Sequence, residues 1–242
     1  MTSTGASPEP AAAIRGPRLG APPGRLLALA AVCAALFTAL AVTTALRHGA
    51  PLAPERGALH AALAHRGEPL RSLAGALTAT GTGVVPYLMA LLAGLSAGRD
   101  ARGRLRAALG AVLVLAAGQA VRYGLMELLA RPRPPHADWA AGATGFSFPS
   151  GHATTSALAA GLLAWGVLHR TRPGAGRPWC ALLALWAVGV GLTRVYLGVH
   201  WAGDVLAGWL LAGALLALAL LLDPLVVPRA PGTAEALPTA WP

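Results

Sequence analysis

Apolar segments of about 20 residues dominate the sequence, and short stretches rich in arginine separate them. A helix needs about 20 apolar residues to cross a bilayer, where each backbone polar group must find its partner within the protein. Six segments meet this description, at 26–46, 73–95, 107–130, 153–168, 179–197 and 202–222. The sequence therefore predicts an all-α integral membrane bundle of six transmembrane helices.

Composition supports a membrane protein and argues against other classes. Only 12% of the 242 residues are charged, whereas soluble domains carry about 25%. The length suits one compact domain at 25–222, flanked by disordered tails at 1–24 and 223–242. The net charge of +10 comes from scattered arginines, so no nucleic-acid partner is expected. Cys33 and Cys180 lie in apolar segments and are expected to be buried thiols.

The placement of arginine predicts the orientation in the membrane, because short basic loops mark the cytoplasmic side. Arginines precede the first segment, follow the sixth, and occupy the loops after the second and fourth. Six spans then place both termini in the cytoplasm and the loops 47–72, 131–152 and 198–201 outside a plasma membrane. Residues 55–72 alternate charged with apolar residues, which predicts a helix lying on the outer surface.

Three polar clusters interrupt the apolar pattern, and this topology places all three on the outer side. They are Arg-Pro-Arg-Pro at 131–134, Pro-Ser-Gly-His at 149–152 and the stretch TRVYLGVHWAGD at 193–204. Polar groups beside lipid are costly and are usually functional. Three clusters at one level of the membrane therefore predict one site.

The residue types in these clusters suit a phosphate group. Arg133 and Arg194 carry planar guanidinium groups that match phosphate oxygens. Ser150 can donate its hydroxyl, Gly151 lets the backbone approach a ligand, and the start of the helix presents free N–H groups.

Two histidines add the means to transfer the phosphoryl group. One of His152 and His200 can attack phosphorus while the other protonates the leaving oxygen. His200 and Asp204 are four residues apart, so they share a face if this segment is helical. A carboxylate there can hold one tautomer of the imidazole and stabilise the imidazolium.

These motifs resemble those of the type 2 phosphatidic acid phosphatase (PAP2) superfamily, which includes undecaprenyl-pyrophosphate phosphatases and vanadium haloperoxidases. The family motifs are Lys-x6-Arg-Pro, Pro-Ser-Gly-His and Ser-Arg-x5-His-x3-Asp. The second is intact at 149–152, and the third has Thr193 in place of Ser. The first keeps Arg133 and Pro134 but has Met126 where the family has Lys.

The resemblance implies a PAP2/haloperoxidase-like core and a metal-independent lipid phosphatase without cofactors. His200 would form a phosphohistidine, Asp204 would orient it, and His152 would be the general acid. The phosphoryl oxygens would be held by a further set of residues, namely Arg133, Ser150, Gly151 and Arg194. The substrate would be an isoprenyl pyrophosphate, phosphatidic acid or a related lipid phosphate. The oligomeric state is not predicted.

The missing lysine leaves two outcomes open. Arg122 lies one helical turn before Met126 on the same face and can supply the absent charge. Otherwise the enzyme is slower or acts on a different substrate. A PAP2-scaffold protein that binds lipid phosphates without turnover is the alternative function. A vanadate-dependent peroxidase fits less well, because such enzymes are soluble.

Each residue also has an ordinary structural interpretation. Ser150 and Asp204 could cap helices, and His152 could fill a polar helix start. Arg131 and Arg133 could extend towards lipid headgroups. Four coincidences at the family spacing would be needed, so the phosphatase site is favoured.

Other residues receive no catalytic role. Thr193 either keeps the function of the family serine or merely packs. Glu127 is expected to face an interface or to pair with an arginine such as Arg131. The tryptophans near span ends are expected to anchor the protein at the membrane interface, namely Trp179, Trp201 and Trp209.

Overall fold

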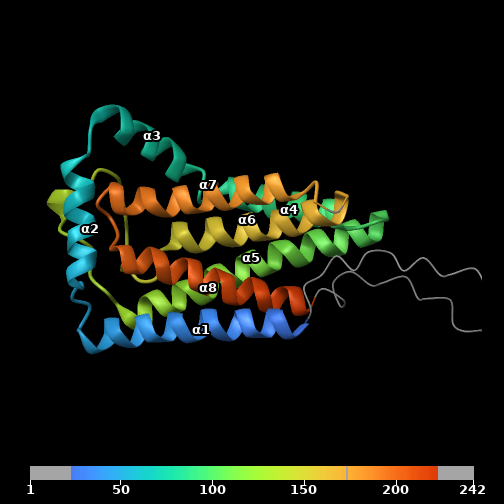
Figure 1. The fold of residues 1–242 in the computed structure, drawn as a ribbon, viewed down its shortest axis with the longest axis horizontal. Coiled ribbons are helices and arrows are strands. Elements are labelled where there is room, and N and C mark those ends of the chain that lie inside the picture. Colours follow the sequence, from blue (N-terminus) through green and yellow to red (C-terminus); the bar gives the residue numbers. More distant parts are fainter. Residues whose placement is uncertain (1–22, 173, 223–242) are drawn as a thin grey trace, which may run out of the picture.

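The computed structural model describes residues 23–172 and 174–222, and all of their regular structure is helical. The elements are α1 (Pro23–Leu46), α2 (Ala53–Ala64), α3 (Glu68–Ala79), α4 (Val84–Ala97), α5 (Ala101–Leu129), the 3₁₀ helix η1 (His136–Asp138), α6 (Gly151–Arg170), α7 (Arg177–Tyr196) and α8 (Ala202–Leu221). The long helices form a bundle, and α2 stands across one end of it (Figure 1). The all-α prediction is confirmed for these residues. The predicted tails lie outside them, except that Pro23 and Gly24 begin α1.

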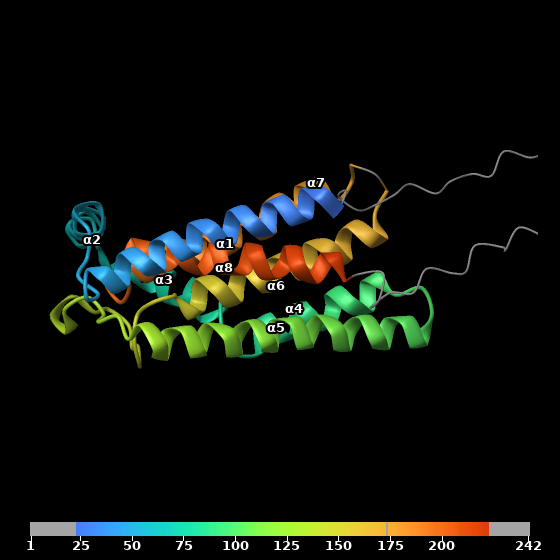
Figure 2. The same cartoon turned by 90° about the horizontal axis from the view of Figure 1, so that it is seen from below.

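Helix α6 occupies the middle of the bundle. It packs against α4, α5, α7 and α8, and Figure 2 shows it between α8 and the pair α4 and α5. Its first turns bury three hydroxyl side chains, those of Thr154, Thr155 and Ser156. Neighbouring helices rather than lipid surround this polar part of α6.

Four helices are long and apolar enough to cross a membrane: α1, α5, α7 and α8. The bent pair of α3 and α4 would make a fifth span. Helix α6 is long enough to cross a membrane, but its mean hydropathy is too low, because its first turns carry polar residues. These turns lie inside the protein. The predicted count of six spans is therefore not confirmed.

The second predicted span, 73–95, is not a continuous helix. Helix α3 ends at Ala79, α4 begins at Val84, and their axes differ by 49°. Gly83 has a φ of +69°, which glycine adopts without a steric penalty. Similarly, the predicted surface helix at 55–72 is divided, since α2 ends at Ala64 and α3 begins at Glu68.

Small residues let the central helices approach closely. A Cβ at Gly166 of α6 would collide with the backbone of Ala93 in α4. Such contacts are typical of helix packing in membranes, where lipid removes the hydrophobic drive for association. Leucines on the outer faces of α1, α5 and α7 are exposed, as lipid-facing residues would be. Cys33 and Cys180 are free and half-buried, so they form no disulfide.

The connections divide between the two ends of the bundle. Those from α1 to α2, from α5 to α6 and from α7 to α8 lie at the end covered by α2 (Figure 1). The arginine-rich connections from α4 to α5 and from α6 to α7 lie at the other end, where α1 begins and α8 ends. The three polar clusters consequently meet at one end of the bundle.

Candidate active site

The start of α8 brings His200 and Asp204 together. His200 lies in the connection before α8 and Asp204 in its first turn, so the segment between them is only partly helical. Oδ2 of Asp204 accepts a hydrogen bond from the backbone N–H of Trp201 at 2.9 Å and lies 3.3 Å from Nδ1 of His200. His200 is 3% exposed and Asp204 is fully buried. Asp204 therefore caps α8 and contacts the imidazole at the same time.

Arg133 approaches the other nitrogen of this imidazole. Its Nη1 lies 3.0 Å from Nε2 of His200. A guanidinium can only donate, so Nε2 must accept and carry the lone pair. The hydrogen then resides on Nδ1, facing Asp204. The two neighbours together hold His200 as one neutral tautomer.

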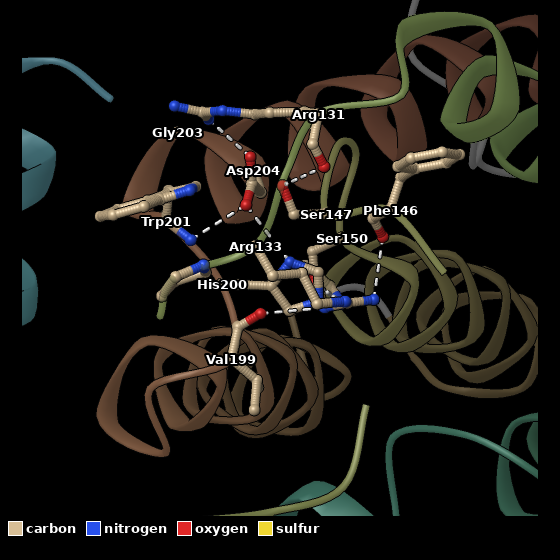
Figure 3. Close-up of polar contacts among 12 residues, drawn as sticks. Arg131, Arg133, Phe146, Ser147, Ser150, Val199, His200, Trp201, Gly203 and Asp204 are labelled. Atoms are coloured by element: carbon tan, nitrogen blue, oxygen red, sulfur yellow. Dashed lines mark hydrogen bonds and ion pairs between the residues drawn. The ribbon is translucent and has the colours of Figure 1, made fainter. Parts of the chain in front are cut away.

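Every N–H of the Arg133 guanidinium is engaged within the protein. Besides the bond to His200, the guanidinium donates to four backbone carbonyls, and Figure 3 shows its bonds to Val199 and Phe146. These belong to Gly145 at 3.0 Å, Val199 at 2.9 Å, Thr144 at 2.8 Å and Phe146 at 2.9 Å. A guanidinium has five N–H groups, so none remains free. Contact between Arg133 and a phosphate requires one of these bonds to be exchanged.

A buried ion-pair cluster lies behind Asp204. Arg131, which is 2% exposed, donates to Oδ1 of Asp204 at 2.6 Å (Figure 3). It also forms a two-pronged ion pair with Glu55, at 3.0 Å and 2.8 Å. The expectations that Arg131 reaches towards lipid headgroups or pairs with Glu127 are therefore wrong. Trp201 is also misassigned as an interfacial anchor, because it is 7% exposed and donates to the carbonyl of Pro132.

Glu55 is the participant that the sequence analysis missed. It lies on α2, and its carboxylate also accepts from the backbone N–H groups of Leu52 and Gly203, at 2.7 Å and 3.1 Å. A Cβ at Gly203 would collide with this carboxylate, so the close approach requires glycine. Glu55 is 76 residues from Arg131 and 148 from Gly203, and no local spacing could signal either contact.

The second polar cluster forms the start of α6. Ser150 is fully buried, and its Oγ accepts a long hydrogen bond of 3.5 Å from the N–H of Ala153, which confirms the capping interpretation. Gly151 and His152 follow in the first turn and are half-buried. The Arg122 side chain lies against this turn, since a Cβ at Gly151 would be 3.4 Å from its Cζ.

Met126 occupies the position of the family lysine. It is 5% exposed and lies 3.1 Å, through its Sδ, from Nη1 of Arg122. Arg122 thus passes over Met126 towards the start of α6. Its role as a replacement for the lysine stays a prediction.

Arg194 differs from Arg133 in its hydrogen bonding. It lies in the last turn of α7 and is 3% exposed. Its Nη1 donates to Oγ1 of Thr78 at 2.9 Å, but its buried Nε has no hydrogen-bond partner. Buried donors are nearly always satisfied, and exceptions need an explanation such as an absent ligand. Arg194 therefore has unused capacity for an anion.

The break between α3 and α4 contributes two threonines that the sequence analysis did not select. Thr78 accepts from Arg194, and Oγ1 of Thr82 lies 3.5 Å from Nε2 of His152. The glycines within this apolar segment were the available signal. By contrast, Thr193 donates to the carbonyl of Val190 in its own helix at 2.6 Å, so its hydroxyl is already occupied.

Positive charge surrounds the two histidines. The guanidiniums of Arg194, Arg133 and Arg122 all lie near His152. Burial lowers the pKa of His200 to about 4; its carboxylate partner opposes this shift, and the nearby guanidiniums of Arg133 and Arg194 reinforce it. His200 is therefore neutral at pH 7, in agreement with its tautomer.

The arrangement is suited to a nucleophilic displacement on an anionic group. It combines the neutral, oriented imidazole of His200, the second imidazole of His152 and a guanidinium, that of Arg194, with an N–H group that has no hydrogen-bond partner. Within residues 23–172 and 174–222, no three His, Cys, Asp or Glu side chains are grouped as metal ligands would be.

Comparisons with known proteins point to one family. The profile of the PAP2 superfamily matches residues 107–226, which include all three polar clusters. Phosphatidylglycerophosphatase B of Escherichia coli K12 is 44% identical over 63 residues, which cover 26% of this chain and 23% of that protein. The proteins of the same name from Escherichia coli O157:H7 and Shigella flexneri match equally well. This chain thus aligns with about a quarter of the curated relatives' length.

A solved structure extends the likeness to most of the fold. The transmembrane PAP2 type phosphatidylglycerolphosphate phosphatase from Bacillus subtilis superposes with a TM-score of 0.67 at 26% identity. The match covers 79% of this chain and 94% of that one.

Proposed function

Since this chain belongs to the PAP2 superfamily, we propose that it is a membrane phosphatase that hydrolyses a phosphomonoester or pyrophosphate of a lipid. The observation that carries the proposal is the environment of His200. Asp204 lies at Nδ1, so the Nε2 lone pair is available to react once Arg133 releases it. This is the geometry of an activated imidazole nucleophile.

In the first step, Nε2 of His200 attacks phosphorus and the bond from phosphorus to the leaving oxygen breaks. The imidazole becomes cationic and keeps its hydrogen on Nδ1, where Asp204 stabilises it. The anionic substrate offsets the charge of the nearby guanidiniums, so His152 is protonated in the complex and donates this proton to the leaving oxygen. In the second step, a water gives a proton to His152 and attacks phosphorus, so inorganic phosphate leaves and His200 is restored.

The phosphoryl oxygens bind to the donors that the protein leaves unsatisfied. These are Arg194, the backbone N–H groups at the start of α6 around Gly151, and Arg122 in place of the absent lysine. The Ser150 hydroxyl and Arg133 join them on binding. Arg133 does so by exchanging its bond to His200 for a phosphate oxygen, which frees Nε2 for attack.

Phosphatidylglycerol phosphate is the first candidate substrate, because two sets of relatives bear that activity in their names. Isoprenyl pyrophosphates and phosphatidic acid share its reactive group, a phosphate on a lipid. The mechanism uses no metal and no cofactor. EDTA should therefore leave the activity unchanged.

For the membrane, we take residues 25–222 as one catalytic domain with six spans, counting α6 and the bent pair of α3 and α4. The site then faces outward and both termini face the cytoplasm. The arginine-rich connections at the opposite end of the bundle support this orientation. Single-cysteine variants at Ala137 and Gly174 should label from opposite sides, with Ala137 external; labelling from one side would overturn the topology.

The alternative is a PAP2-scaffold protein that binds lipid phosphates without turnover. Met126 at the lysine position and the saturated Arg133 favour it. The experiment that decides is phosphate release by the purified protein in detergent from phosphatidylglycerol phosphate, phosphatidic acid and undecaprenyl pyrophosphate, with EDTA present. Release from at least one lipid supports the phosphatase, whereas binding of all three without release supports the alternative.

A further inference from the structure

The cluster of Glu55, Arg131 and Asp204 has an odd number of charges. Two carboxylates share one guanidinium, and all three residues are at most 7% exposed. His200 beside them is neutral, so the group carries one net negative charge. An uncompensated buried charge is costly, so the site must gain from keeping it.

That charge matches what the proposed reaction creates. When Nε2 of His200 bonds to phosphorus, its ring gains one positive charge next to Asp204. The cluster and the ring are then neutral together. The cluster is thus balanced for the phosphorylated state rather than for the resting state, in which Arg133 supplies the nearest counter-charge to His200.

Glu55 prevents Arg131 from neutralising the negative charge of Asp204. Arg131 lies 2.6 Å from Oδ1 of Asp204, and alone it would leave that ion pair without net charge. Glu55 takes both Nη groups of Arg131 in its two-pronged contact. Building on the proposed function, we propose that Glu55 is a positioning residue that preserves the charge of Asp204 for the catalytic His200.

The expected effect can be separated from a loss of structure. Glu55→Gln keeps the shape and removes the charge, so the imidazolium becomes less stable. Its amide NH2 also faces two of the donors that the carboxylate accepts from, so thermal unfolding is measured beside the kinetics. The charges facing His200 are those of Asp204, backed by Arg131, on one side and of Arg133 and Arg194 on the other, with His152 nearby. We expect kcat to fall about tenfold to a hundredfold, which is the scale of one charge-assisted bond. KM should change less than about threefold, because the substrate does not touch Glu55.

Two further variants test the charge itself. Glu55→Gln combined with Arg131→Gln restores one net negative charge, so its kcat should exceed that of Glu55→Gln. A merely structural role predicts no recovery of the His200 pKa in the double variant, whereas a restored charge raises that pKa above its value in Glu55→Gln. Glu68→Gln is the matched control, because Glu68 also begins a helix but is exposed and pairs with Arg71.

The experiment measures kcat, KM and thermal unfolding of the four proteins in detergent, with phosphatidylglycerol phosphate as the substrate. The acid limb of kcat/KM should move to lower pH in Glu55→Gln, since a weaker negative environment makes His200 less basic. A wild-type kcat and an unmoved limb in Glu55→Gln would overturn the proposal. So would a double variant slower than Glu55→Gln, or the failure of both to fold.

Failure of the proposed function has a different signature. In that case the wild-type protein itself releases no phosphate from any lipid. The pKa of His200, read by NMR of labelled histidine, still tests Glu55 in that protein. A lower pKa in Glu55→Gln supports the inference, and an unchanged pKa overturns it.

Discussion

Arg131 and Arg194 are equally buried, yet their surroundings differ. Arg131 belongs to an anchored group, with Glu55 and Asp204, in which charges meet charges at 2.6–3.0 Å. Arg194 belongs to an open group, with Arg122 and His152, in which Nε of Arg194 has no partner. The comparison teaches that burial alone does not identify a ligand-binding arginine. A buried N–H group without a partner is the better indicator, because the folded protein leaves such a donor available to a ligand.

The largest effect on phosphate release should follow from His200→Ala, because His200 lies between the anchored group and the open group. Removal of the nucleophile should reduce phosphate release at least about a thousandfold. Size-exclusion behaviour and thermal unfolding in detergent should stay close to those of the wild type. Turnover above a few per cent of the wild-type rate would show that another group attacks phosphorus.

The two arginines should respond to substitution in opposite ways. Arg194→Ala should lower kcat/KM about a hundredfold to a thousandfold, as when a transition-state donor is lost, with little change in unfolding temperature. Arg131→Ala should destabilise the protein by about 3–5 kcal/mol, because two carboxylates remain buried without their counter-ion. Paired thermal unfolding and kinetic assays measure both. Equal losses of stability would remove the distinction between the anchored and open groups.

Substitution of Arg122 and Met126 tests whether Arg122, in the open group, replaces the family lysine. If it does, Arg122→Ala should cut the rate about tenfold to a hundredfold, and Met126→Lys should largely rescue that loss. A silent Arg122→Ala, together with a faster Met126→Lys enzyme, would exclude Arg122 from the phosphate site. Initial rates at saturating and limiting substrate separate the effects on kcat and KM.

The pH dependence sharpens the assignment of His200. Only its neutral form can attack, and burial lowers its pKa to about 4. We therefore expect activity to persist through weakly acid pH and kcat/KM to fall tenfold per unit only below about pH 4. An acid limb near the ordinary pKa of about 6.5 would show that His200 is better solvated than the structure indicates.

The smallest effect should come from Thr193→Val. The hydroxyl of Thr193 is bound to the carbonyl of Val190 and has no hydrogen left for substrate. Activity should stay within about twofold of the wild type, because this hydroxyl donates within its own helix. Loss of that bond should cost only about 1 kcal/mol of stability. A larger loss of kcat would place Thr193 among the substrate contacts.

The sequence predicted what short motifs encode. Asp204 and His200 are four residues apart, and Ser150 caps its own helix, so local spacing sufficed for both. It did not predict Glu55, because three chain segments far apart in sequence build that contact. The saturation of Arg133 was also beyond reach, since it depends on the path of the 144–146 loop.

Hydropathy was a reliable guide where helices face lipid and a poor one inside the bundle. Helix α6 buries threonines against protein, so its apolar signal is weak although it is central. The sequence signals of the bend between α3 and α4 were Gly81, Gly83 and Pro86. Glycine permits such a break without requiring it, and contacts with Trp186 and Val190 of α7 fix the geometry.

The break between α3 and α4 bears on how water, the second reactant of a hydrolysis, reaches the site. Backbone that leaves a helix at membrane depth must be covered by protein or reached by solvent. Here it opens beside His152, with Thr82 at 3.5 Å from the imidazole. In the proposed mechanism, hydrolysis of the phosphohistidine consumes one water next to His152. If the break is the route by which this water reaches His152, Thr82→Val should slow phosphate release, because the hydroxyl next to the imidazole would be lost.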